Sequence, residues 1–196
     1  MSTPLAQLPP AERYRVIAER FTTVTHGVTD WDAPTPVAEW RARDVVDHLV
    51  TWLPALIHGG SDHRFEAGPS AQEDPVGAWE HLDTQVRALF VDPVAAQCLH
   101  SGPHTGQDKP VPEVIDQVFT GDVFFHTWDL ARSSGQDDAL DAGLVHGAYT
   151  GMSAMEDVLR PSGQFGQQQP VPADATEQEK LFAFLGRDPR WAPSAH

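Results

Sequence analysis

Hydrophobic positions recur every three or four residues in several parts of the chain, and this period predicts amphipathic α-helices. The first such segment covers about 10–27 and the second about 42–58. Their apolar stripes consist of Tyr14, Ile17, Phe21 and Val24, and of Val45, Val46, Leu49, Trp52, Leu53 and Leu56. Between them, the segment DWDAPTPVAEW contains two prolines that disfavour a regular helix. We therefore expect a loop there, attached to the core by Trp31 and Trp40.

The second half of the chain shows the same period with clearer start signals. Asp74 followed by Pro75 predicts an N-cap and a first helical residue, and Thr176 with Glu179 predicts a capping box. The helices expected here cover about 75–90, 112–133, 142–159 and 176–184. The second of these is apolar on almost every side, which is typical of a central helix.

Four long helices, additional short ones and little strand signal predict an all-α protein, a helix bundle in a single domain over 1–196. The connections 61–74 and 92–110 are long, so simple up-down-up-down connectivity is not expected. His100 and His104 fall in the second connection and are expected to face solvent.

Charge and composition narrow the expected partners. The chain has 13 Lys and Arg against 28 Asp and Glu, a formal net charge of −15. Because such a surface repels phosphate backbones, nucleic acid is not expected to bind. No apolar run approaches the roughly 18 residues of a membrane span, and the first residues lack the features of a signal peptide. The lone Cys98 allows no internal disulfide, so we expect a cytoplasmic protein.

One polar pattern in the fourth long helix carries candidate chemistry. Asp122 and His126 are four residues apart and project from one helix face. His48, on the core side of the second helix, is the best-placed third ligand. Two imidazole nitrogens and a carboxylate oxygen suit Zn²⁺, Ni²⁺, Fe²⁺ or Mn²⁺, with a position left for water or substrate. Asp129 is expected to support this group or to fix a loop. The alternative is a hydrogen-bonded Asp–His pair without a metal.

Three segments taken together resemble the DinB-like metal-binding superfamily, namely WDAPTPVAEWRARDVVDHLV, GDVFFHTWDLARSSG and LFAFLGRDPRW. The resemblance is closest to the actinobacterial branch that includes the N-terminal domain of mycothiol-dependent maleylpyruvate isomerase, and it covers nearly the whole chain. It implies a DinB-like four-helix bundle with His48, Asp122 and His126 as metal ligands. Asp122 stands where the isomerase branch usually has Glu and other DinB-like proteins have His, so we expect either that the helix lies closer to the ion or that a water molecule bridges the carboxylate and the ion.

The resemblance also implies a function. We expect a divalent ion, Zn²⁺ before Ni²⁺, Fe²⁺ or Mn²⁺, and a low-molecular-weight thiol such as mycothiol as co-substrate of an S-transferase or isomerase-like enzyme. A small-molecule electrophile would bind in an apolar pocket lined by Trp52, Phe125 and Trp128. The isomerase has an additional C-terminal domain that these residues do not include, so maleylpyruvate isomerisation is not the expected reaction. The alternatives are a metal-dependent hydrolase and a non-catalytic metal- or ligand-binding stress protein. Helix bundles of this family often pair, so a homodimer is compatible with the resemblance.

Overall fold

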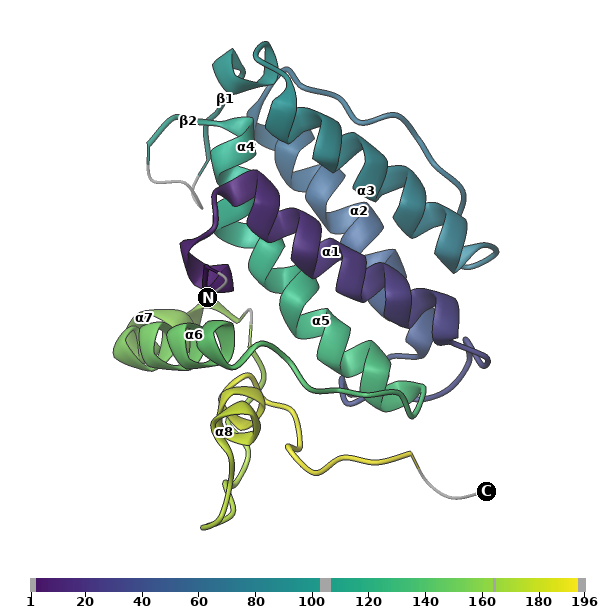
Figure 1. Ribbon diagram of the computed structural model, residues 1–196, viewed down its shortest axis with the longest axis vertical. Helices are drawn as coiled ribbons and strands as arrows, with labels where there is room; N and C mark the ends of the chain where they lie inside the picture. The colour runs from purple at the N-terminus through teal and green to yellow at the C-terminus, as the bar shows by residue number, and fades with distance from the viewer. Residues whose placement is uncertain (1–2, 103–106, 164, 194–196) are drawn as a thin grey trace.

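Four long helices form the body of the protein, as the hydrophobic period predicts (Figure 1). This is a computed structural model, and it describes residues 3–102, 107–163 and 165–193. The long helices are α1 (Pro10–Gly27), α2 (Ala42–Gly60), α3 (Pro75–Val91) and α5 (Thr120–Ser133). The all-α prediction is therefore confirmed, with a bundle at its centre.

Shorter elements connect and flank the bundle. A two-stranded antiparallel ladder pairs β1 (Leu99–His100) with β2 (Lys109–Pro110) just before α5. The fourth predicted helix is divided into α4 (Val111–Val114), a π-helical segment (Ile115–Phe119) and α5. The predicted fifth helix is divided into α6 (Ala142–Ala154) and α7 (Glu156–Leu159), and α8 (Glu177–Phe184) is the last. Single 3₁₀ turns cover Leu5–Gln7, Ala95–Gln97 and Arg160–Ser162.

Local capping explains where several helices begin. The Asp74 side chain accepts a hydrogen bond from the Gly77 amide at 2.9 Å, at the start of α3. Thr176 and Glu179 form the reciprocal capping box of α8, since each side chain accepts from the other's backbone amide. Both devices satisfy amide groups that a helix start leaves without partners, and both are readable in the sequence.

The connectivity is not up-down-up-down. Segment 61–74 runs back along the bundle, since Phe65 bonds to His58 near the end of α2 whereas Gln72 bonds to Asp44 near its start. Helices α2 and α3 therefore point the same way. Helices α1 and α5 are parallel as well, because Arg13 pairs with Asp116 at one end and Gln136 bonds to the Val24 carbonyl at the other.

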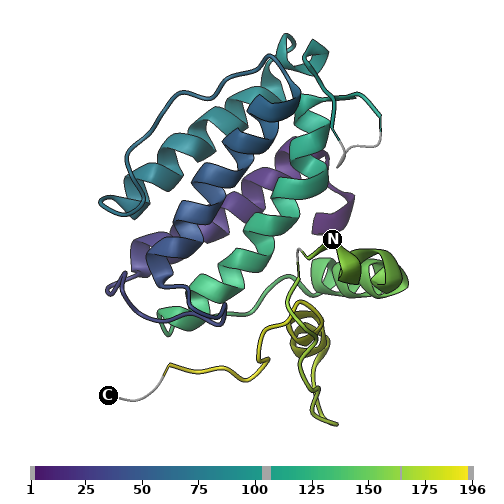
Figure 2. The same ribbon diagram turned by 180° about the vertical axis from the view of Figure 1, so that it is seen from behind.

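Each long helix packs on two others around one core. Helix α1 contacts α3 and α5, and α2 contacts the same pair from the other side. Figure 2 shows α2 and α5 side by side along the bundle. The largest fully buried side chains belong to one core, to which α8 adds Leu181 and Phe182: Trp79, Trp128, Tyr14, Phe21, Phe119, Phe182, Leu49, Leu53, Ile57, Ile115, Leu130 and Leu181.

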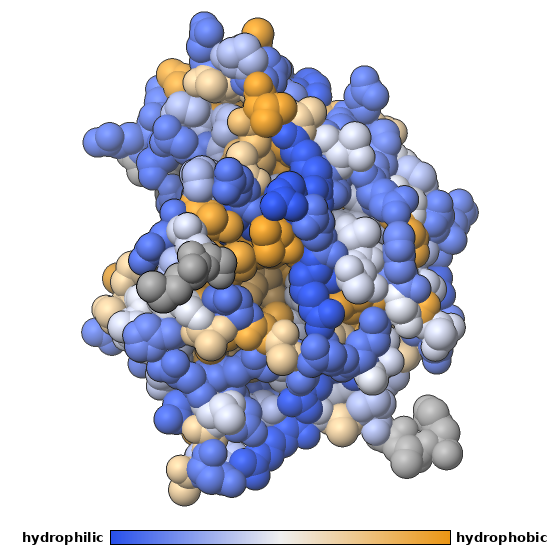
Figure 3. Space-filling model, viewed as in Figure 1, coloured by the Kyte–Doolittle hydropathy of each residue, from blue (hydrophilic) through white to orange (hydrophobic). Residues whose placement is uncertain are grey.

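Helices α6 to α8 lie beside one end of the bundle (Figure 1). Apolar residues gather at a hollow between them and α1 (Figure 3). A cleft of about 240 Å³ in this region is lined by Leu5, Val16, Ile17, Arg20, Phe124, Thr127, Ala139, Leu140 and Asp141. Among the described residues, no helix combines the length and the hydrophobicity that a membrane span requires.

Candidate metal centre

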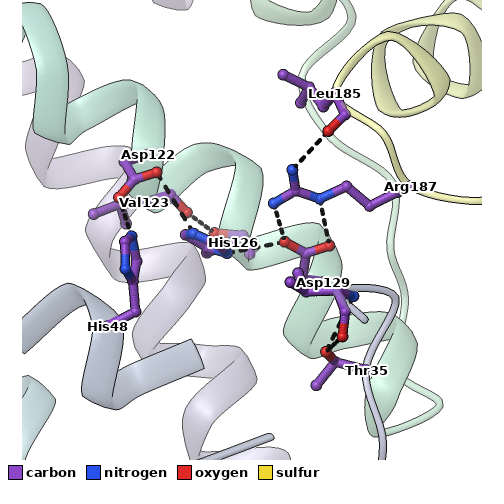
Figure 4. A network of polar contacts seen from close by, with 10 residues as sticks. Thr35, His48, Asp122, Val123, His126, Asp129, Leu185 and Arg187 are labelled. Carbon is purple, nitrogen blue, oxygen red and sulfur yellow. Dashed lines mark hydrogen bonds and ion pairs between the residues drawn. The ribbon is translucent and has the colours of Figure 1, made fainter. Parts of the chain in front are cut away.

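The three predicted ligands meet where α2 packs against α5 (Figure 4). One donor atom from each of His48, Asp122 and His126 lies within 4.8 Å of the other two. The His48 Nε2 atom is 3.0 Å from Asp122 Oδ2, and the His126 Nε2 atom is 3.5 Å from Asp122 Oδ1. The structure thus brings the three residues that the sequence singled out into one group.

The helices position this group by simple packing. Val45 and Leu49 are fully buried and fix the rotation of α2, so that His48 points toward α5. On α5, Asp122 and His126 are one turn apart on the same face. The side chain of His126 is 4 % exposed, whereas those of His48 and Asp122 are 28 % and 25 % exposed. The group therefore has one closed side at His126 and one side open to solvent.

His126 is held from behind by Asp129, as the sequence suggests. The His126 Nδ1 atom is 2.9 Å from Asp129 Oδ2, and Asp129 has no exposed surface. A carboxylate only accepts, so Nδ1 carries the proton and donates it to Asp129. The Nε2 atom of His126 then faces Asp122 and the candidate ion position, which is the arrangement that metal-binding histidines use.

Arg187 completes this chain of contacts, and the sequence prediction did not include it. Its Nη2 and Nε atoms donate to Asp129 Oδ2 and Oδ1 at 3.0 and 3.3 Å, and its Nη1 atom donates to the Leu185 carbonyl at 3.2 Å. Arg187 follows α8, so it comes from a different part of the chain than the ligands (Figure 4). The segment GRDPRW contains it, but no spacing relates that segment to Asp129.

Both carboxyl groups are held in the ionised form. Burial favours a higher pKa for Asp122, but the attraction of His126 and the hydrogen bond from His48 outweigh it and lower the pKa below its ordinary value. Burial opposes ionisation of Asp129 as well, and the charge of Arg187 with the His126 hydrogen bond again lowers the pKa. An ionised carboxylate is the form that binds a divalent ion.

Aromatic rings surround the two imidazoles. Trp40 stacks on His126 at 5.6 Å between ring centroids and lies 5.1 Å from the ring of His48, while Trp52 stacks on His48 at 6.0 Å. Trp40 follows Glu39, whose φ of 68° lies in the left-handed region that is unfavourable for a residue with a side chain. Such strain often accompanies a functional position. The sequence prediction assigned Trp40 to the core but missed its contact with the ligands.

The predicted pocket residues separate into two groups. Trp52 lies beside His48, with 6.0 Å between the ring centroids. Phe125 and Trp128 instead pack on Phe182 of α8, at centroid distances of 6.5 and 3.9 Å. Because Trp128 is only 1 % exposed, it forms part of the contact between α5 and α8. The aromatic ring that lies beside both His48 and His126 is that of Trp40, not that of Phe125 or Trp128.

The expectation for His100 was wrong. This side chain is buried, and its Nε2 atom lies 3.0 Å from the Leu56 carbonyl near the end of α2. Gly60 makes room for it, since a Cβ atom there would meet the imidazole at 2.3 Å. His100 therefore ties the ladder to α2. His104 lies outside the described residues.

The donor geometry fits a divalent ion. Metal–ligand bonds of roughly 2.0–2.2 Å place the donors of a tetrahedral site about 3.4 Å apart. The Nε2 atoms of His48 and His126 lie 3.0 and 3.5 Å from the two different carboxylate oxygens of Asp122, which is close to that value, and one donor atom from each of the three residues lies within 4.8 Å of the other two. Two neutral imidazoles and one carboxylate also match the donor types of zinc sites with an open position.

The fold and the site define a helix-bundle protein with a candidate metal centre between two of its long helices. The chain is similar to two uncharacterized proteins of Mycobacterium tuberculosis, from the strains CDC 1551/Oshkosh and H37Rv. Each is 29% identical over 169 residues, which cover 80% of this chain and 85% of the relative. No protein-family model and no solved structure matches the chain.

Proposed function

We propose that this protein binds one divalent metal ion through His48, Asp122 and His126 and uses it in thiol-dependent S-transfer. The observation that supports the proposal is the convergence of these three donors from distant parts of the chain. His48 and Asp122, which form a hydrogen bond, are 74 residues apart in the sequence. Asp129 fixes the tautomer of His126. The resemblance to the DinB-like superfamily, in which the same positions hold a metal, supports the choice of Zn²⁺ first.

The side chains divide the work in the following way. His126 and Asp129 form the closed side of the site, and His48 and Asp122 form the side that substrate approaches. When bound, a divalent ion lowers the pKa of a coordinated thiol, or of a coordinated water in the hydrolytic alternative. Trp40 and Trp52 offer flat apolar surfaces against which the body of an electrophile packs. In the transfer itself, the thiol sulfur forms a bond to an electrophilic carbon, the leaving group departs, and the thiol proton passes to water.

The first test is metal content by elemental analysis of the purified protein after incubation with Zn²⁺ or Ni²⁺. We expect about one ion per chain in the wild type and loss in His48→Ala, Asp122→Ala and His126→Ala. His146→Ala is the matched control, because that imidazole lies on α6, exposed and paired with Glu177. A wild type without metal would overturn the proposal.

The second test separates the reactions. An S-transferase consumes an aryl chloride only when mycothiol is present, with formation of a carbon–sulfur bond and release of chloride. A hydrolase turns over ester or amide substrates without thiol. A metal-binding protein without catalysis retains its ion in the first test and gives neither reaction, which would overturn the transfer part of the proposal alone.

A further inference from the structure

The segment after α8 reaches the back of the candidate metal centre along a constrained path. Gly186 has a φ of 93°, and a Cβ atom there would lie 2.6 Å from the Cα of Gly166. The Arg187 amide then donates to the Phe182 carbonyl at 2.9 Å. The crossing of two glycines and this hydrogen bond fix the direction in which the Arg187 side chain leaves the segment.

Arg187, Asp129 and His126 form a continuous line of charge-assisted hydrogen bonds (Figure 4). Asp129 Oδ2 accepts from both neighbours, at 2.9 Å from His126 Nδ1 and 3.0 Å from Arg187 Nη2. Asp129 is fully buried and the Arg187 side chain is 14 % exposed. A two-point guanidinium–carboxylate contact restricts the orientation of the carboxylate, and through it the imidazole of His126.

The same segment also docks through an apolar contact one residue away. Phe182 stacks on Trp128, with 3.9 Å between ring centroids and 14° between ring planes. Two successive residues of α5 thus hold the segment: Trp128 stacks on Phe182, and Asp129 pairs with Arg187. If the segment detached, the Phe182–Trp128 contact and the Arg187–Asp129 ion pair would be lost at the same time.

We propose that Arg187 is a positioning residue through which docking of segment 181–191 and ion binding at His48, Asp122 and His126 strengthen each other. This inference rests on the proposed metal site. An ion on Nε2 of His126 makes its Nδ1–H a stronger donor, so the bond to Asp129 tightens and the carboxylate holds Arg187 more firmly. By linkage, the factor by which the docked segment tightens ion binding equals the factor by which the ion stabilises docking.

The test compares Zn²⁺ affinities, measured by competition with a chromophoric chelator, and the visible spectrum of bound Co²⁺. We expect Arg187→Gln to weaken binding about 10- to 100-fold, a typical cost of losing a residue that orients a ligand, and to alter the Co²⁺ spectrum. Arg187→Lys keeps the positive charge but loses the two-point guanidinium contact with Asp129, so we expect its Zn²⁺ affinity to lie between those of the wild type and Arg187→Gln. Arg190→Gln is the control, since Arg190 lies in the same segment but pairs with Asp174 and Glu179 at the surface.

A wild-type measurement covers the case in which Arg187→Gln fails to fold. Zn²⁺ is expected to slow amide hydrogen exchange within 181–191, because an ion that binds the docked state more tightly stabilises that state. Unchanged exchange in the wild type, or an Arg187→Gln variant that binds Zn²⁺ and Co²⁺ as the wild type does, would overturn the inference and leave the metal site standing. A wild type that binds no metal removes both proposals.

Discussion

Two buried aspartates show how the surroundings of a single residue decide its charge. Each carboxylate oxygen of Asp129 accepts a hydrogen bond from the guanidinium of Arg187, and the pKa of Asp129 is lowered despite burial. Asp83, in the core face of α3, accepts a hydrogen bond from Arg87 at 2.8 Å, and its carboxyl group lies beside the buried hydroxyl of Tyr14. Burial raises the pKa of Asp83, and the attraction of Arg87 only partly offsets it. Tyr14 faces this carboxylate, and burial together with Asp83 raises the pKa of its hydroxyl.

We predict that Asp83 makes the protein less stable as pH rises. A carboxyl whose folded pKa exceeds its unfolded pKa binds more protons in the native state, so its contribution is present below the ordinary value of 3.8 and is lost as pH rises through the folded pKa. The difference in unfolding free energy, Asp83→Asn minus wild type, should therefore increase from acidic to neutral pH in urea titrations. Glu113→Gln serves as an exposed control. A difference that stays constant or decreases with pH would contradict the raised pKa.

At the same scale, the sequence pointed to three residues that lie together in the structure, but it did not point to the residues that hold them there. Asp122 and His126 share a helix, so their relation is encoded in a spacing of four. Arg187 is 58 residues from Asp129, and Trp40 meets the imidazoles through a turn whose Thr35 amide donates to the Trp40 carbonyl at 3.0 Å. Such contacts depend on tertiary packing that no local pattern records.

Among the elements, the helices were predictable because their starts carry local chemistry. The bounds of α1 agree with the prediction, and the capping box of α8 was read from Thr176 and Glu179. The π-helical segment Ile115–Phe119 was not foreseen, since its composition does not differ from that of the helix around it. Such segments frequently accompany functional sites, and this one ends three residues before Asp122. The parallel course of α2 and α3 was equally hidden, because a long connection indicates a non-simple topology without specifying it.

Helix α8 is expected to depend on one ring for its attachment. Phe182→Ala removes a fully buried ring that stacks on Trp128, so we expect the unfolding free energy to fall by about 3–5 kcal/mol. Limited proteolysis should then cut segment 160–190 faster than in the wild type. Val158→Ala on α7, a 75 % exposed residue, should change stability by less than about 0.5 kcal/mol. Equal resistance of Phe182→Ala and wild type would show that other contacts hold α8.

For the whole molecule, the excess of acidic groups dominates the long-range field. A formal charge of −15 on 196 residues makes the folded state repel itself, and added salt screens this repulsion. We predict a higher melting temperature in high NaCl than in low NaCl, measured by calorimetry on metal-free protein. We also expect no binding to duplex DNA at about 50 mM salt, where electrostatic association is strong. Retarded DNA that is released by salt would contradict this picture of the surface.

The order of the three candidate ligands along the chain has a consequence for biosynthesis. His48 leaves the ribosome long before Asp122, and at roughly 5–20 residues per second the 74 residues between them take several seconds to synthesise. During that interval the first imidazole has neither its carboxylate partner nor the helix that encloses it. Arg187 follows Asp129 by a further 58 residues. A nascent chain therefore passes through a stage in which all three candidate donors have been made and Arg187, the partner of Asp129, is still missing.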